Sequence, residues 1–433
     1  MDTNIINIRI FDNAINFLGE VDNFTSLFYI RKWETFGEFE FHISIMDINL
    51  IKKGNIIMLN KDGNRVGVIE HIEINKDSTE EITVKGFSLA YWFTQRITIP
   101  PIGYENHSFN LMVEDIMIAL VKANAVDPVD INREIPNLII ETSKGRGDKL
   151  QFQTRHKNLA DELTKLSKAS GLGFTVDLDY KAKKFVFKVL EGLNLSYGQG
   201  INPPAIFSLD YDNILKQNYI ESNIGYKNVG YVAGQGEGVD RQIEILGNEL
   251  SGFERRETFI DARDIEDGTN LADRGKVKLS ETQQIQNFEC EVDSKDYKDT
   301  WNLGDIVTTI NKKLKLRVDN RVSEVKEVYE NSGFKVEPIF GNPIPTLNEK
   351  IKQMTDTPGE SSSGGSGGGD KYYTFNQISS KSVWKIPHGL GKFPSVTIVD
   401  SGGNEVIGDI KYIDNNNLEI TFSAAFSGIG YLN

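Results

Sequence analysis

The glycine-rich segment at residues 234–238 is the part of the sequence closest to a phosphate-binding loop. A dinucleotide-binding loop follows a strand and opens directly into a helix, whose N-terminus faces the phosphates. Here residues 242–246 have a strand pattern instead, and Glu237 adds negative charge. The pattern therefore favours a structural turn and predicts no cofactor. The glycines of this turn are Gly234, Gly236 and Gly238.

Alternating charges surround this turn. Such a pattern is typical either of a solvated loop or of a subunit contact with paired ions, and the sequence leaves both open. Carboxylates at residues 254–267 also allow an alternative function, a hydrolase that degrades cell wall, because glycosidases need two carboxyl groups about 5 to 9.5 Å apart. The charged residues are Glu237, Arg241, Arg255, Arg256, Asp261, Arg263 and Asp264.

The histidines and the single cysteine do not have the spacing of a reactive site. Zinc sites need closely spaced His and Cys ligands, and no second cysteine is present. Cys290 alternates with Phe288 and Val292, which favours a buried core thiol over a nucleophile. No nucleophile elbow or Walker A sequence occurs. We therefore expect no metal, no catalytic residue and no enzyme activity. The histidines are His42, His71, His107, His156 and His388.

Length and charge set limits on the class of protein. The chain has 433 residues, of which 39% are hydrophobic and 25% charged, and its net charge is −14. This length predicts about two to four domains. The negative charge argues against a surface that coats nucleic acid, although DNA could pass through an acidic channel without binding. The sequence predicts neither a secretory signal nor a membrane span, which needs about 18 apolar residues.

Two stretches about 250 residues apart share one strand–turn–strand pattern, and we interpret them as a duplication. The stretches are residues 51–74 and 301–328, and the match begins at a glycine in each, Gly54 or Gly304, with Asp305 after the second of them. A glycine at such a turn predicts a positive φ or a close backbone approach. The matched positions are Gly54 with Gly304, Arg65 with Arg317, Val66 with Val318, Ile69 with Val322, and Ile72 with Val325.

The predicted fold class is mainly β with α+β insertions: two related β-barrel domains, α+β domains and a small C-terminal all-β domain. Residues 346–370 contain Ser-Ser-Ser-Gly-Gly-Ser-Gly-Gly-Gly, which is typical of a flexible linker. The predicted domains are a first β-barrel (1–101), an α+β domain (102–204), a second β-barrel (205–233 and 285–345), an inserted domain (234–284), the linker (346–370) and the C-terminal β-domain (371–433).

Local patterns predict the main helices and hairpins. Ser108 is expected to cap a helix that reaches residue 124, and Asn158 a helix that ends at Gly171. A third helix is expected at residues 271–279. Separate strands are expected at residues 316–318 and 322–328.

Four stretches, at residues 232–241, 251–257, 261–264 and 301–307, resemble the baseplate hub, or tail-associated, proteins of bacterial virus tails. The similarity is greatest to siphoviruses and prophages of Gram-positive hosts. It covers about residues 1–345 and implies two related β-barrel domains separated by α+β domains, assembled as a homotrimer.

The end of the chain resembles the small β-domain found at the ends of many tail and fibre proteins. The similar stretches are 384–396, 400–404, 412–414, 420–422 and 431–433. Many tail-associated proteins have a peptidoglycan-cleaving domain here, so this departure argues against a lytic role. Trp384, His388 and Phe393 flank a Pro-His-Gly-Leu-Gly turn, and we expect them to form a surface that binds another tail protein or host cell-wall glycan.

The resemblance implies a structural protein of the virion tail, assembled in the host cytoplasm. Three chains with two barrels each would supply six similar units, so a trimer could adapt a sixfold tail tube to threefold distal parts. The implied partners are the distal tail protein ring and tail fibre or tip proteins. DNA would pass through the lumen without specific binding.

Overall fold

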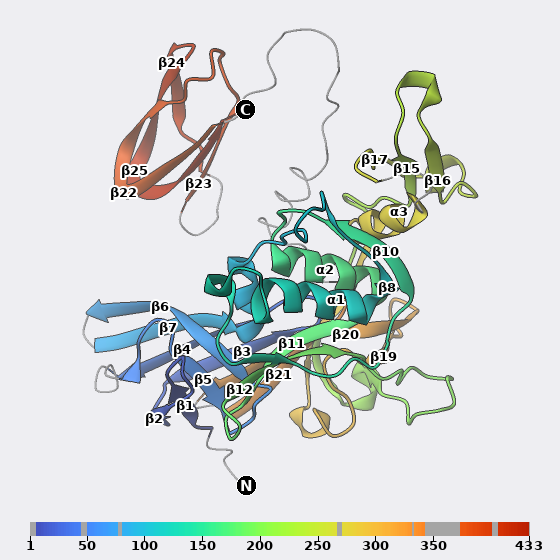
Figure 1. Cartoon of the computed structure of the whole chain (residues 1–433). Helices are drawn as coiled ribbons and strands as arrows, with labels where there is room; N and C mark the ends of the chain where they lie inside the picture. The colour runs from blue at the N-terminus through green and yellow to red at the C-terminus, as the bar shows by residue number, and fades with distance from the viewer. Residues whose placement is uncertain are drawn as a thin grey trace. The chain divides into compact units, whose positions relative to one another are not determined.

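The computed structural model describes residues 6–44, 50–76, 80–265, 271–330, 333–342, 373–400 and 406–432. The chain divides into two compact units, Met1–Pro358 and Gly359–Asn433 (Figure 1). Strands dominate both units and form several sheets, as the sequence predicts. The linker predicted at residues 346–370 lies outside the described residues.

One extended sheet contains strands from both ends of the larger unit. β20 pairs antiparallel with β3, which joins a first and a second set of strands into a single sheet. The first set is β1 (Ile8–Phe11), β2 (Phe17–Val21), β3 (Ser26–Lys32), β4 (Glu38–Ser44), β5 (Ile56–Leu59), β6 (Val66–Lys76) and β7 (Glu80–Ser88). The second set is β13 (Ile206–Ser208), β14 (Ile214–Ser222), β18 (Ile285–Val292), β19 (Ile306–Asn311), β20 (Leu316–Glu330) and β21 (Gly333–Gly341).

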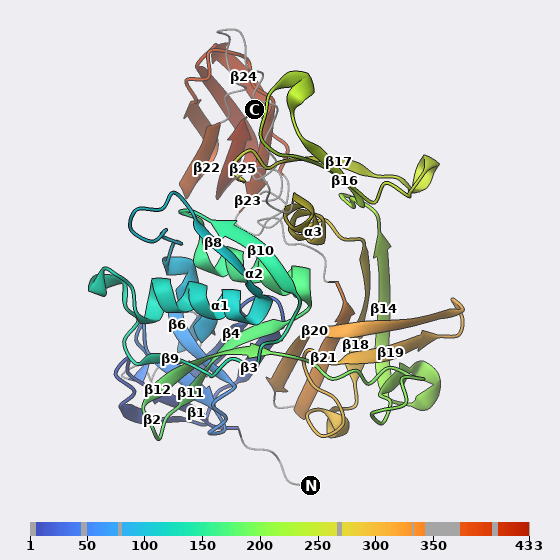
Figure 2. The ribbon, with the colours of Figure 1, turned by 45° about the vertical axis from the view of Figure 1, so that its right-hand side comes forward.

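The strand pairings of this sheet follow an open path. Among the described residues the order is β14-β18-β21-β20-β3-β4-β7-β6-β5-β1-β2, with β19 and β13 attached to β20, and no pairing closes either predicted barrel. The strands of the second set from β14 to β21 lie in the right-hand part of Figure 2, where β18 pairs with β14 and β21 lies between β18 and β20. Within the first set, the apolar residues of β1, β4, β5 and β7 share one core.

The two sets have the same strand order. It is β3-β4-β7-β6-β5-β1 in the first set and β14-β18-β21-β20-β19-β13 in the second. A β-bulge follows Ile69 in the β6–β7 pair, and another follows Val322 in the β20–β21 pair. The pairing of β1 with β5 is antiparallel, whereas that of β13 with β19 is parallel. Apart from this last pair, the order is the one that a duplication requires.

Backbone hydrogen bonds align the two sets residue by residue. The amide of Gly54 donates to Ile69 O and the amide of Gly304 to Val322 O, each at 2.8 Å, so Ile69 corresponds to Val322 as predicted. The predicted match of Val66 with Val318 is wrong by one residue. Val66 lies opposite Met58, and Asp319 lies opposite Thr308, the residue that corresponds to Met58.

β20 is a single strand of 15 residues, so the prediction of two separate strands is wrong. Its first part pairs with β19 and its second part with β3 and β21. The bulge after Val322 shifts the alternation, and Val325, Glu327 and Tyr329 are buried while Val328 is only half-buried. Because of this bulge, the side chain of one acidic residue, Glu327, points into the interior.

Residues 107–190 form an α+β region around two helices, α1 (Val113–Val121) and α2 (Leu159–Ser170) (Figure 1). Asn158 caps α2, accepting from Ala160 N and Asp161 N, and Gly171 ends it at φ +75°, as predicted. Ser108 does not cap α1, because it lies in β8 and the helix begins only at Val113. The strands are β8 (His107–Met112), β9 (Leu138–Ile140), β10 (Lys149–Thr154), β11 (Gly173–Asp179) and β12 (Lys184–Leu190).

A small insert follows β14. It has three strands, β15 (Val229–Ala233), β16 (Ile243–Leu246) and β17 (Glu257–Asp261), and the predicted helix α3 (Leu271–Ser280). β15 pairs with β16 and β17 in a sheet of their own. The prediction that placed β15 in the second barrel is therefore wrong.

The smaller unit is all-β in its described residues, as predicted. Its strands are β22 (Tyr373–Pro387), β23 (Val396–Asp400), β24 (Asp409–Asp414) and β25 (Asn417–Leu432). β25 pairs with each of the other three. Its core includes Trp384, Ile386, Ile398, Leu418 and Ile420.

Candidate assembly interface

The two matched glycine turns differ in their surroundings. Gly54 and Gly304 both have positive φ, +85° and +92°, which confirms the prediction for these turns. A Cβ on Gly304 would lie 2.0 Å from the indole ring of Trp33, whereas a Cβ on Gly54 would meet no atom within 4 Å. The buried Asp305 carboxylate accepts from Leu193 N and Asn302 N, both at 2.8 Å. Of the two glycines, only Gly304 is therefore packed against another part of the chain.

Gly304→Ala should destabilise the protein more than Gly54→Ala. Both changes carry the cost of a left-handed conformation, about 1–2 kcal/mol, but only Gly304→Ala also drives a methyl group into Trp33. Urea unfolding of the two variants measures the difference. Equal losses of unfolding free energy would show that the contact with Trp33 is unimportant.

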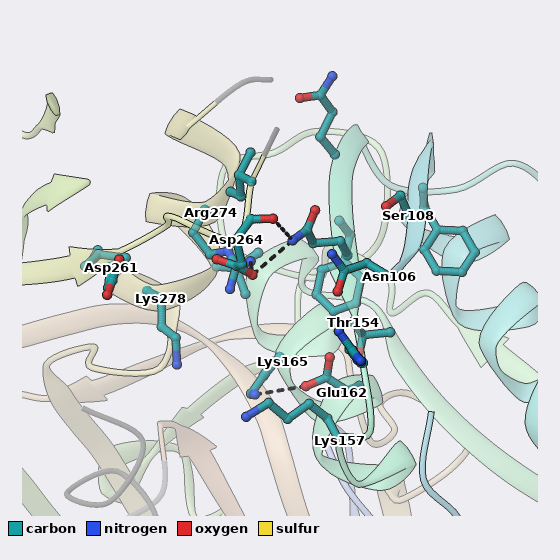
Figure 3. A pocket seen from close by; sticks show the side chains of 18 of the residues that line it. Asn106, Ser108, Thr154, Lys157, Glu162, Lys165, Asp261, Asp264, Arg274 and Lys278 are labelled. Atoms are coloured by element: carbon teal, nitrogen blue, oxygen red, sulfur yellow. Dashed lines mark hydrogen bonds and ion pairs between the residues drawn. The ribbon is translucent and has the colours of Figure 1, made fainter. Parts of the chain in front are cut away.

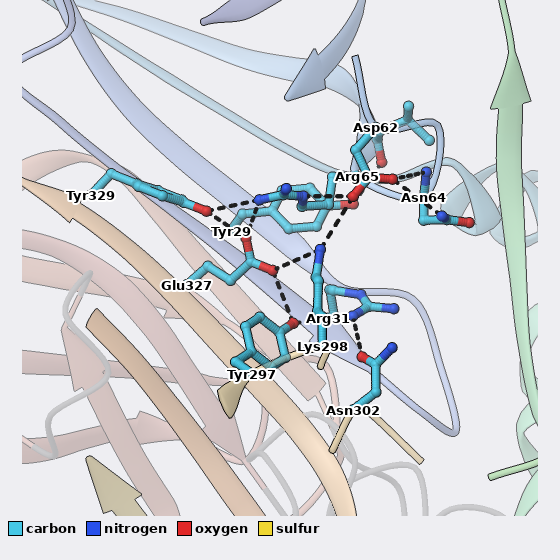
Figure 4. A network of polar contacts seen from close by, with 11 residues as sticks. Tyr29, Arg31, Asp62, Asn64, Arg65, Tyr297, Lys298, Asn302, Glu327 and Tyr329 are labelled. Atoms are coloured by element: carbon cyan, nitrogen blue, oxygen red, sulfur yellow. Dashed lines mark hydrogen bonds and ion pairs between the residues drawn. The ribbon is translucent and has the colours of Figure 1, made fainter. Parts of the chain in front are cut away.

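A buried charge cluster lies where β20 meets β3 (Figure 4). Its centre is the fully buried Glu327 carboxylate, which lies 2.8 Å from Arg65 Nη1 and 3.7 Å from Lys298 Nζ. The hydroxyls of Tyr297 and Tyr329 donate to it at 2.9 and 2.7 Å. Arg65 belongs to the first set, and Lys298 and Glu327 to the region of the second set. The ion pairs and hydrogen bonds of this cluster therefore connect the first set of strands to the second.

The surroundings of Glu327 determine its charge. Burial alone would raise the pKa of this carboxyl, but Arg65, Lys298 and the hydroxyl of Tyr329 outweigh burial, and its pKa lies below the usual range. Burial likewise opposes the charge of Asp62, yet Lys298, the Asn64 amide and Arg65 bring its pKa to about 2. Both groups are therefore carboxylates at neutral pH.

Edges of β2, β6, β13 and β14 have no partner strand among the described residues. β14 ends the path and pairs only with β18. β6 pairs with β5 only as far as Val68, so its edge from His71 onward is unpaired on that side. Apolar side chains are exposed on both strands: Ile74 of β6 is 49% exposed and Leu215 of β14 is 63% exposed. Unpaired edges of this kind are surfaces on which another strand can add.

One face of the extended sheet is polar. Its side chains alternate along each strand with the buried core residues, and carboxylates outnumber lysines on it. The carboxylates are Glu38, Glu40, Glu73, Glu81, Glu289, Glu291, Glu324, Glu330 and Glu337. The lysines are Lys32, Lys85, Lys216, Lys326 and Lys335. Part of the same face is covered on β5 and β6, where Ile56, Met58, Val66 and Val68 share a core with α1 and α2.

The predicted cluster around the glycine turn comes together in part. Arg241 Nε donates to Gly234 O at 3.0 Å, and its Nη2 donates to Asp261 Oδ1 at 2.6 Å. Arg263 pairs with the other Asp261 oxygen at 2.7 Å, and bonds from Arg263 and then Arg241 lower the pKa of Asp261 to about 2. Gly236 and Gly238 have positive φ, and only a three-residue turn precedes β16. Hydrogen bonds from Arg241 therefore stabilise this segment as a structural turn.

A cleft of about 720 Å³ lies between β8, β10, α2, β17 and α3 (Figure 3). Each carboxylate that lines it has a basic partner within 3.2 Å. The pairs are Glu105–Arg155, Glu162–Lys165, Asp261–Arg241, Asp264–Arg274 and Glu281–Lys278. Each of these carboxylates is thus held in an ion pair, which is typical of a structural contact.

Cys290 is buried beside Phe288 and Val292, and burial raises the pKa of its thiol to about 12. This agrees with a core thiol. Among the described residues, no three His, Cys, Asp or Glu side chains are grouped as metal ligands. In the same part of the chain, no helix has the length and apolarity needed to cross a membrane.

The three residues expected to form a binding surface in the smaller unit lie in different environments. Trp384 is fully buried and His388 is 4% exposed, so neither belongs to a surface. Phe393 is 63% exposed and packs edge-on against Tyr412. Three further exposed apolar side chains, which sequence reasoning missed, occur in or beside β24: Ile407, Ile410 and Ile413. The alternating pattern of β24 did not reveal them, because every residue of this strand is exposed.

The chain matches a family model over residues 7–342, and the family is described as Siphovirus ReqiPepy6 Gp37-like protein. The chain belongs to this family. The match confirms the resemblance to siphovirus tail proteins. No curated protein sequence matches the chain.

Solved structures of tail proteins share the fold. A tail protein from Neisseria meningitidis MC58 is 13% identical with a TM-score of 0.51, and the match covers 78% of this chain and 96% of that protein. Prophage tail protein gp18 from Listeria monocytogenes EGD-e is 14% identical with a TM-score of 0.50, covering 81% and 99%. At these identities the similarity is one of fold.

Proposed function

We propose that this protein is the baseplate hub of a phage tail or phage-tail-like particle and forms a homotrimeric ring. The observation that carries the proposal is the repeated strand order, with the two sets joined side by side through β20 and β3. Three such chains would present six similar sets around one axis. A ring of this kind can adapt a sixfold tail tube to threefold distal parts.

The polar face of the extended sheet supports a channel through this ring. The carboxylate-rich part of this face, on β4, β7, β18, β20 and β21, would line the lumen. Its excess of carboxylates would repel the phosphates of passing DNA and not bind them. The expected partners are the distal tail protein ring above and fibre or tip proteins below, in the virion tail.

We propose a docking role for the smaller unit, with Phe393, Ile410, Tyr412 and Ile413 as the contact surface. These exposed aromatic and aliphatic side chains suit contact with another tail protein, and an aromatic pair also suits stacking on a cell-wall sugar. Phe393→Ala should weaken capture of either partner. Capture by the full chain, measured with purified fibre proteins and with host cell-wall glycan, would distinguish the two.

The protein's position in the tail tests the hub proposal. Antibodies against the larger unit should label one end of purified tails, the distal end, in electron micrographs. Labelling along the whole tube would overturn the proposal. Zymography on host cell walls tests the hydrolase alternative, which a zone of clearing would favour.

A further inference from the structure

We propose that neighbouring chains of the ring join by strand addition, with β6 of one chain pairing antiparallel with β14 of the next. In this register Ile74 lies opposite Tyr219 of the neighbouring copy. The inference rests on the proposed ring and specifies the surface that builds it. It follows from the internal repeat, because the chain already contains one junction between a second set and a first set.

The junction within the chain supplies the geometry. β20 of the second set pairs with β3 of the first set, and Glu327 lies opposite Tyr29. β6 occupies the position of β20 in the first set, and β14 occupies the position of β3 in the second. Both strands have unpaired edges among the described residues; the other unpaired edges, on β2 and β13, lie at the opposite end of each set. If all six sets are arranged alike, β6 must meet β14 of the next chain as β20 meets β3.

The register follows from residues that lie opposite each other. In the first set, Ile69, Gly86, Phe39 and Tyr29 lie opposite one another in turn across β6, β7, β4 and β3. In the second set, Val322, Phe340, Phe288 and Tyr219 do the same across β20, β21, β18 and β14. Tyr219 therefore corresponds to Tyr29.

The residue of β6 that lies opposite Tyr219 follows from its distance in sequence from the β-bulge. Ile74 follows Ile69 by five residues, as Glu327 follows Val322, and both strands have their bulge at the same place. Ile74 therefore corresponds to Glu327. The pair Glu327–Tyr29 within one chain predicts the pair Ile74–Tyr219 between chains.

The side chains make the two junctions chemically different. Within the chain, Glu327 is buried among Arg65, Lys298 and two tyrosine hydroxyls. Between chains the corresponding residue is Ile74, and Ile72 takes the place of Val325. Arg31, which lies opposite Val325, corresponds to Glu221. The junction between chains is therefore mainly apolar at its centre, with Ile74 packing on the ring of Tyr219.

This difference in side chains disfavours pairing of the wrong strands, β20 of one chain with β14 of another. If β20 of one chain paired with β14 of another, Glu327 would lie opposite Tyr219 with Glu221 nearby, where β3 presents Arg31. A buried carboxylate beside a second carboxylate is unfavourable. Arg31 near Glu327 at one junction and Glu221 beside apolar residues at the other therefore favour alternation of the two, which three chains complete in a closed ring.

Cysteine pairs test the register in the full chain, purified and in assembled tails. In a Cys290→Ala background, Ile74→Cys with Tyr219→Cys should give covalent dimers and trimers on oxidation, because directly opposed residues have Cβ atoms about 4.5–5.5 Å apart. The matched control is Ile74→Cys with Asn218→Cys, because adjacent strand residues point to opposite faces. This control pair should give at least tenfold less cross-linked product.

A charge substitution tests the same contact independently. Ile74→Asp should convert trimer to monomer in native mass measurements while the monomer keeps its melting temperature, since Ile74 is half-exposed in the single chain. Glu73→Ala, on the polar face, should leave the trimer intact. A trimer that forms normally with Ile74→Asp, or that cross-links equally with both cysteine pairs, would overturn the β6–β14 junction and leave the ring proposal standing. A wild-type chain that forms no trimer, alone or in tails, would overturn both.

Discussion

Glu327→Ala is expected to cost about 3–5 kcal/mol of unfolding free energy, because it removes the buried carboxylate that faces Arg65 and Lys298 and leaves both cations to the single carboxylate of Asp62. The substitution also removes the acceptor of two buried tyrosine hydroxyls. Urea unfolding followed by tryptophan fluorescence measures the loss. Glu337→Ala is the matched control, since Glu337 is a partly exposed residue of the polar face and its loss should change stability by less than about 1 kcal/mol.

A double substitution separates the contribution of the Glu327 charge to stability from the contribution of its side-chain packing. Replacing both Glu327 and Arg65 by methionine should cost less than Glu327→Ala alone, because no unpaired charge then remains between these two positions. A double variant that is less stable than both single variants would show that the ion pair itself, and not the penalty of breaking it, holds the two sets together.

The cluster also predicts a dependence of stability on pH. The pKa of Glu327 is lower in the folded protein than its ordinary value of 4.5, and that of Asp62 falls from 3.8 to about 2. Both carboxyls therefore contribute stability that is complete above about pH 4.5 and is lost as the pH falls toward 2. Glu327→Gln should show a smaller loss over this range. An identical pH profile for Glu327→Gln would mean that Glu327 does not titrate with folding.

Trp384→Ala should unfold the smaller unit. Trp384 is fully buried against Phe422 and Phe426, and removing a buried indole costs about 3–5 kcal/mol, comparable to the whole stability of a unit of this size. Hydrogen exchange of β25 in the full chain should rise to that of an unfolded strand. Phe393→Ala, at a 63% exposed position, should leave the exchange of β25 unchanged. Protected β25 amides in Trp384→Ala would show that this core tolerates the cavity.

Local patterns predicted the elements that local interactions determine. The cap of Asn158, the stop at Gly171, the burial of Cys290 and the turns at Gly54 and Gly304 depend on residues close in sequence, and all agree with the structure. Repetition of the glycine turn also led to the correct alignment of Ile69 with Val322.

Features that depend on distant partners were missed. Glu327 lies in a strand of alternating charges and has no local sign of burial, since its partner Arg65 is far away in sequence. The β-bulge after Val322 exchanges the inward and outward positions of the later residues of β20. The spacing of the valines in the sequence gives no sign of this exchange. Trp384 flanks a turn and was therefore expected at a surface, yet it packs into the core of its unit.

The mass of the purified full-length chain in solution decides whether the proposed ring forms. We expect a homotrimer, three chains of 48.7 kDa each, in native mass spectrometry, with Ile74→Asp converting it to the monomer. A wild-type chain that remains monomeric both alone and together with its tail neighbours, or that forms dimers, would contradict the proposed ring.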